Sequence, residues 1–157
     1  MSTMGPTNNL SYLIEHLSSV ISKQADQTLQ EQLGIGFSQF KILMVLEWNP
    51  RVQQKTIALG LGQTEASISR QIKLLEKKGL LTARVNPQNR RKHITVPTAL
   101  GMQITEAASG IMRRSFGPEY SSLGDDQVMQ LISGLQKLHH VVCRKGRIGA
   151  CDHPLGL

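Results

Sequence analysis

The sequence predicts a mainly α (α+β) fold, and three observations support this class. Leucine, isoleucine and valine recur at steps of three and four residues along most of the chain, which is the periodicity of amphipathic helices. Only one pair of short segments, residues 80–85 and 92–96, has strand character, and a turn-forming sequence joins them. Aromatic residues make up 4% of the 157 residues, a share that disfavours a β-sandwich. We therefore expect a helical protein with one β-hairpin, whose turn is longer than two residues.

Apolar periodicity and capping residues predict six helices. They cover residues 9–32, 37–47, 52–61, 65–78, 99–116 and 125–144. Ser38, Thr64 and Thr98 are the expected N-terminal caps, because a hydroxyl there accepts a hydrogen bond from an unpaired backbone amide. Gly79 occupies the position after the fourth helix where a left-handed residue is favoured, and Gly117-Pro118 is expected to end the fifth helix.

The third and fourth helices, with the hairpin that follows them, predict a winged helix-turn-helix over residues 37–98. A tight Gly62-Gln63 turn joins the two helices. In such a motif the second helix enters the major groove of DNA while the first crosses the backbone. At 100° per residue, Ile68, Ile72 and Leu75 fall within one narrow arc, which we expect to be buried. The opposite side carries Ala66, Ser67, Arg70, Lys73 and Lys77.

Positive charge is concentrated in the same segment. The chain has a net charge of +7, and residues 63–93 hold eight cations and two anions. Such a concentration is typical of a polyanion-binding surface, although charge alone fits a solvated surface equally well. The candidate DNA contacts are Gln63, Thr64, Ser67, Arg70 and Lys73 on the helix, and Arg90 and Arg91 on the hairpin. Arg70 could read guanine or bind a phosphate.

Other functional classes find little support in the sequence. No apolar run reaches the roughly 18 residues of a membrane span, and residues 1–9 lack a signal-peptide pattern, so a cytoplasmic protein without membrane contact is expected. The chain has no glycine-rich phosphate loop, no metal-hydrolase spacing and no nucleophile motif. We therefore expect neither an enzyme nor a cofactor. A winged helix that serves only as a protein-interaction module is the remaining rival, and it would need an apolar or mixed outer face on residues 65–78.

Histidines and cysteines near the C-terminus suggest a second possibility. Cys143 follows His140 by about one helical turn, and Cys151 and His153 could complete a four-ligand metal site; His139 lies beside them. A metal-responsive or redox-responsive regulator is therefore an alternative. We expect no metal site as the primary interpretation, because the spacing is weak and the tail from residue 146 onward is expected to be loose.

Three motifs of the chain are characteristic: FKIL at residues 40–43, LGQTEASISR at residues 61–70 and LEKKGLL at residues 75–81. With these motifs the chain resembles the MarR family of bacterial transcription regulators. The family's Asp-x-Arg wing and Leu-Thr-x-x-Gly helix start correspond to residues 89–91 and 97–101 of this chain. Asn89 replaces the wing aspartate, so the bond that would orient Arg91 becomes a neutral one. Pro97 replaces a leucine and removes a strand donor, and Leu74 stands where a polar residue is common.

The resemblance implies a homodimer that binds a pseudo-palindromic operator. The implied organisation is an N-terminal dimerisation helix (residues 1–36), the DNA-binding lobe (37–98), C-terminal dimerisation helices (99–145) and a flexible tail (146–157). The apolar stripes of the first and last helices also exceed what a lobe of about sixty residues needs to cover. The resemblance further implies a repressor that a small aromatic molecule or an oxidant releases.

Overall fold

The computed structural model describes residues 5–144, 146, 147 and 151. The chain divides into two compact units, Met1–Phe37 and Ser38–Leu157. Each unit is described by itself. No helix among the described residues is long and apolar enough to cross a membrane.

The first unit consists of α1 (Pro6–Leu33) and the turn that follows it. Five large apolar side chains in the N-terminal half of α1 are exposed: Leu10, Tyr12, Leu13, Ile14 and Leu17. The carboxylate of Asp26 accepts a hydrogen bond of 2.8 Å from the backbone N–H of Phe37, the first residue of the next helix. The prediction that Ser38 caps this helix is therefore wrong, since Ser38 lies inside it.

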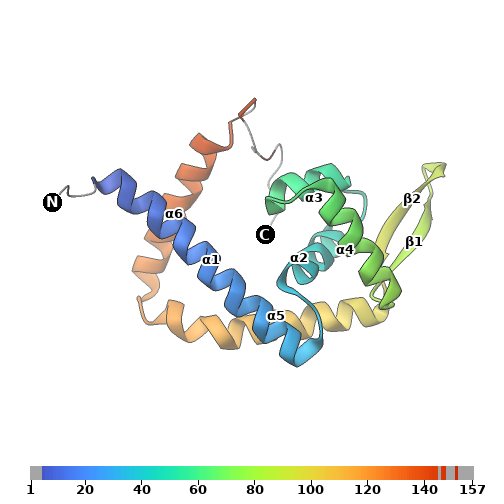
Figure 1. The fold of residues 1–157 in the computed structure, drawn as a ribbon, viewed down its shortest axis with the longest axis horizontal. Coiled ribbons are helices and arrows are strands. Elements are labelled where there is room, and N and C mark those ends of the chain that lie inside the picture. The colour runs from blue at the N-terminus through green and yellow to red at the C-terminus, as the bar shows by residue number, and fades with distance from the viewer. Residues whose placement is uncertain (1–4, 145, 148–150, 152–157) are drawn as a thin grey trace. The chain divides into compact units, whose positions relative to one another are not determined.

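The described residues of the second unit form five helices and one β-hairpin (Figure 1). Its elements are α2 (Phe37–Trp48), α3 (Gln54–Leu61), α4 (Glu65–Lys77), β1 (Leu81–Asn86), β2 (Asn89–Pro97), α5 (Ala99–Ser121) and α6 (Asp125–Val142). The mainly helical class, the order of elements and the single hairpin are confirmed. The core is built from fully buried aliphatic side chains of three helices: Ile42, Leu43, Ile57, Ile68 and Leu75.

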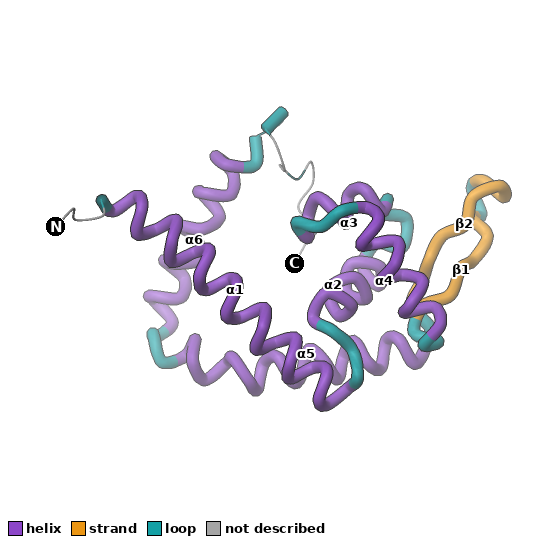
Figure 2. The backbone as a smooth tube through the Cα atoms, viewed as in Figure 1, coloured by secondary structure: helices purple, strands orange, loops and turns teal. Residues whose placement is uncertain are grey.

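The hairpin departs from the predicted turn. Asn86 pairs with Asn89, so the turn itself is only two residues long. The next pair is Val85 with His93, and the register shift leaves residues 90–92 of β2 without paired positions on β1. The prediction of a turn longer than two residues is therefore wrong. The additional residues form a bulge of β2 beside the turn (Figure 2).

Helix α5 continues through the proline that was expected to end it. It runs to Ser121 with Pro118 in its interior, so the predicted end near residue 116 is wrong. A proline costs one backbone donor and crowds the residue before it. That residue is Gly117, which has no Cβ for the ring to meet, and the carbonyl of Pro118 still accepts a bond from Ser122 at 3.1 Å.

Helix α6 contacts α5 but buries none of its residues. Six of its large apolar side chains are exposed: Met129, Leu131, Ile132, Leu135, Val141 and Val142. The predicted loose tail from residue 146 onward lies mostly outside the described residues.

Candidate nucleic-acid interface

Helix α4 has the two faces that its sequence predicts. Ile68, Ile72 and Leu75 are buried. Thr64 caps the helix, since its hydroxyl oxygen accepts a bond of 3.1 Å from the backbone N–H of Ser67. The turn before the helix depends on Gly62, whose φ of 63° lies in the left-handed region that other residues rarely adopt.

The outer face of α4 is cationic and exposed. Arg70, Lys73 and Lys77 are exposed, together with Thr64 at the helix start. Leu74, at 40% exposed, is the one exposed large apolar side chain of α4 among the described residues. Lys41 on α2 is partly buried instead, and this burial lowers its pKa. Most of the exposed positive charge of the α3–α4 pair therefore lies on α4, and Lys55 on α3 adds one further exposed cation.

Gln63 and Ser67 form part of the turn between α3 and α4. The Gln63 amide donates a bond of 2.6 Å to the Ser38 hydroxyl, and its carbonyl oxygen accepts one of 3.2 Å from the Ser67 hydroxyl. Both residues are partly buried. Their first role is thus to hold the start of α4 against α2, which leaves Arg70 and Lys73 as the more accessible candidates.

A buried glutamine without a clear sequence signal connects α2 to the middle of α4 and to the residue that caps its C-terminal end. Gln39 is 7% exposed. Its amide donates to the carbonyl oxygen of Gln71 at 2.9 Å, and its own carbonyl oxygen accepts from the Lys78 amine at 3.3 Å. A buried polar side chain is stable only when it is hydrogen-bonded, so this network favours one position of α4. The sequence signal for Gln39 is weak, because α2 also contains the polar residues Ser38, Lys41 and Glu47.

We expect Gln39→Leu to lower the free energy of unfolding by about 1 kcal/mol, because it removes both bonds while Gln71 can turn to solvent. DNA affinity should fall as well, since α4 loses a tether. Denaturant titration and a DNA-binding assay measure the two effects. Gln71→Leu and the double variant complete a cycle in which the two changes should be less than additive. Additive effects would mean that the two amides are not coupled.

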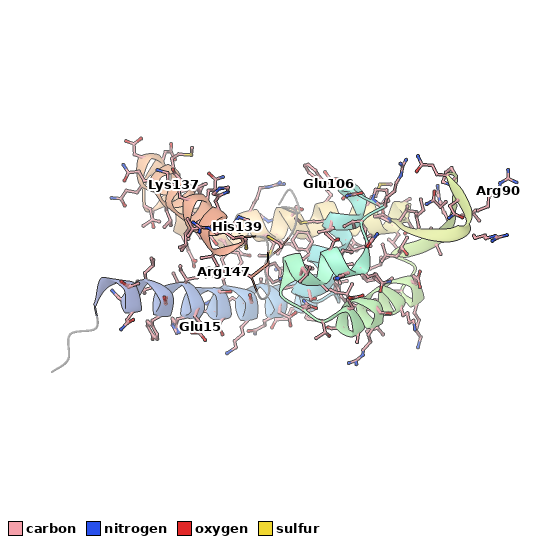
Figure 3. The ribbon with its side chains drawn as sticks, turned by 90° about the horizontal axis from the view of Figure 1, so that it is seen from above. Glu15, Arg90, Glu106, Lys137, His139 and Arg147 are labelled. Atoms are coloured by element: carbon pink, nitrogen blue, oxygen red, sulfur yellow. The ribbon has the colours of Figure 1, made fainter. Side chains whose placement is uncertain are left out.

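The hairpin presents two further cations next to its turn. Arg90 and Arg91 are exposed in the bulge of β2, and Arg90 extends from the tip of the hairpin (Figure 3). The Asn89 side-chain oxygen accepts a bond of 3.1 Å from the backbone N–H of Arg91. This asparagine therefore shapes the backbone of the bulge, and the prediction that its side chain orients the Arg91 side chain is not supported by this bond.

The C-terminal histidines and cysteines gather differently from the prediction. Among the described residues, ligand atoms of His139, Cys143 and Cys151 lie within 4.8 Å of one another. His140 does not belong to this group and lines a different side of α6, together with Ser133 and Lys137. The proposed use of His140 is therefore wrong, and His153 lies outside the described residues.

A short helix, a tight glycine turn, a capped amphipathic helix and a basic hairpin together define a winged helix-turn-helix protein. Residues 33–92 match the model of the MarR family. The segment that holds α2, α3, α4 and most of the hairpin is therefore similar to the MarR family.

Three relatives illustrate the similarity. A transcriptional regulatory protein proposed for the hcr operon of Thauera aromatica is 26% identical over 119 residues, covering 74% of this chain and 70% of that protein. MepR of Staphylococcus aureus, solved in complex with DNA, is 27% identical with a TM-score of 0.69, covering 82% of this chain and 94% of that one. CouR of Rhodococcus jostii RHA1, solved with p-coumaroyl-CoA, is 18% identical with a TM-score of 0.74, covering 87% and 95% of the two chains. MepR is a transcription regulator of the multidrug efflux pump MepA.

Proposed function

We propose that this chain regulates transcription by binding specific sequences of duplex DNA through α4 and the β1–β2 hairpin. The observation that carries the proposal is the division of α4 into a buried apolar face and an exposed face bearing Arg70, Lys73 and Lys77. A protein-interaction module would favour an apolar outer face on this helix. The DNA complex of MepR, at 27% identity, supports the same use of the fold.

Each group of contacts has a distinct role in this proposal. Arg70 and Lys73 face the major groove, where arginine can read guanine and both can bind phosphates. Thr64 and Ser67 lie at the helix N-terminus, whose amides favour phosphate, while Gln63 positions the turn. Arg90 and Arg91 reach the neighbouring minor groove, where the negative potential is strongest at narrow A·T-rich sequence.

The chain acts as a homodimer in this proposal. Helix α6 has six exposed large apolar side chains, and the N-terminal half of α1 has five. Exposed apolar surface of this extent is unusual on a monomer and is typical of an interface. The proposed organisation is residues 1–36 and 99–145 for dimerisation, residues 37–98 for DNA binding and residues 146–157 as a tail. We place the protein in the cytoplasm, as a repressor that a small aromatic molecule or an oxidant releases from its operator.

The proposal is tested by selecting DNA fragments that the full-length protein binds and titrating one of them with salt. Affinity should fall linearly on a log–log scale, with a slope of about −0.9 for each phosphate neutralised. Footprinting should reveal a pseudo-palindrome whose half-sites lie about one helical turn apart. A flat salt response would contradict the DNA interpretation, and protection of a single asymmetric half-site would contradict the dimer.

A further inference from the structure

The end of α6 places two potential metal ligands on one face. His139 and Cys143 are four positions apart in the sequence, so their side chains lie one helical turn apart on the same side. Cys143 directly follows the last helical residue, and its backbone N–H donates a bond of 2.8 Å to the His139 carbonyl. The helix thus fixes the spacing of the imidazole and the first thiol.

The chain then turns and brings a third ligand back to this face. The backbone N–H of Arg147 donates to the Arg144 carbonyl at 3.1 Å, and Gly146 between them has a left-handed φ of 86°. Figure 3 labels both His139 and Arg147 at this end of the chain. Beyond this turn, the sulfur of Cys151 lies 3.2 Å from Nε2 of His139.

The three ligand atoms are already close to the spacing that a tetrahedral metal requires. They lie within 4.8 Å of one another. Metal–sulfur and metal–nitrogen distances of zinc sites imply ligand–ligand separations of roughly 3.5–3.8 Å. Side-chain adjustments of about 1 Å would therefore bring all three onto one ion. Two thiolates and an imidazole are a donor set that favours zinc. Magnesium and calcium favour carboxylates and carbonyls instead.

We propose that His139, Cys143 and Cys151 form a site for Zn²⁺, with the fourth position open to solvent. His139 is exposed and both cysteines are partly buried, so water can reach the ion. Binding displaces a proton from each thiol that is protonated, and the two thiolates neutralise the charge of the ion. The metal would tie the segment after α6 to the last turn of that helix.

The site uses none of the proposed DNA contacts, so its test is independent of the proposed function. Untagged, full-length protein is reduced, freed of metal and checked for two titratable thiols per chain. Titration with Co²⁺ should produce a thiolate-to-metal charge-transfer band that saturates at one ion per chain, and Zn²⁺ should displace the cobalt and remove the band. Elemental analysis after gel filtration should find one zinc per chain.

Matched variants identify the ligands. Cys143→Ser, Cys151→Ser and His139→Gln should each weaken binding by more than about tenfold, since loss of even outer-shell groups can cost that much. His140→Gln changes the neighbouring histidine and should retain the affinity within about twofold. Circular dichroism of each variant separates ligand loss from unfolding. The proposal is overturned if reduced protein with two thiols gives no charge-transfer band, or if His140→Gln weakens binding as much as His139→Gln.

Discussion

Gly101→Ala should lower the free energy of unfolding by at least about 3 kcal/mol, at the upper end of what overpacking costs. A Cβ at this position would lie 2.0 Å from the backbone carbonyl oxygen of Leu80 and 3.0 Å from its carbon. The obstacle is backbone, so no side-chain rotation relieves it. A loss of this size is a large fraction of the stability of a typical domain, about 5–15 kcal/mol.

The strain would fall on the junction between the hairpin and α5. The Leu80 carbonyl accepts a bond of 3.0 Å from the backbone N–H of Thr98, and the Thr98 hydroxyl donates to the Gly79 carbonyl at 2.6 Å. The Thr98 oxygen also caps α5 by accepting from the Gly101 N–H at 3.0 Å. Moving Leu80 away from a new Cβ would therefore disturb the cap of α5 and the base of the hairpin together.

Denaturant titration at fixed protein concentration measures this loss. Gly110→Ala is the matched control, because it lies in the same helix and its Cβ would meet only the tip of the flexible Arg114 side chain, at 3.2 Å. The control should change stability by no more than about 1 kcal/mol, in the direction of stabilisation, since alanine favours helices. Equal stability of the two variants would show that the close approach of Gly101 to Leu80 is absent in solution.

Local signals in the sequence predicted most of the fold. The spacing of Ile68, Ile72 and Leu75 identified the buried face of α4, and the caps at Thr64 and Thr98 identified two helix starts. These features depend only on residues within one or two turns of each other, so periodicity and capping chemistry are sufficient to find them. The expected helix end at Pro118 is wrong because the cost of a proline depends on the residue before it, and Gly117 has no Cβ for the ring to meet.

The candidate site was less predictable where contacts are distant in sequence. Gln39 bonds to Gln71 and Lys78, which are more than thirty residues away, and no local pattern indicates this pairing. Which of His139 and His140 lies near the two cysteines depends on the direction from which Cys151 returns to α6. The spacing of residues along the helix does not determine this direction. The position of the wing arginines in a bulge likewise depended on strand register.

Arg70→Ala should weaken binding to the selected DNA by about 1–3 kcal/mol, or roughly 5- to 150-fold in Kd. The side chain is exposed on the outer face of α4, opposite the buried Ile68 and Ile72, so its loss should leave the fold intact. Fluorescence anisotropy with the selected duplex measures the effect. Thermal unfolding of the variant should match that of the unmodified protein.

Lys137→Ala is the matched control for charge. It removes one exposed cation from α6, outside the proposed DNA-binding surface, and should change Kd by less than about twofold. Gel filtration should first show that Lys137→Ala retains the oligomeric state, because α6 belongs to the proposed dimer interface. If this variant then weakens binding as much as Arg70→Ala, the protein attracts DNA through its net charge alone and the assignment of the outer face of α4 is wrong.

A lysine variant distinguishes what Arg70 contacts. Lysine keeps the positive charge of arginine but lacks the paired hydrogen-bond donors of the guanidinium. Compared with Arg70→Ala, Arg70→Lys should therefore restore most of the affinity if the partner is a phosphate. It should restore little affinity if the partner is a guanine read by two hydrogen bonds, and specificity at one base step should then relax.

Arg91→Ala on the hairpin should weaken binding to all DNA sequences nearly equally and reduce the salt slope by about 1, as expected for a backbone contact. If Arg91→Ala instead relaxes specificity and Arg70→Ala weakens all sequences equally, the roles are exchanged. The hairpin then reads the sequence and α4 binds the DNA backbone.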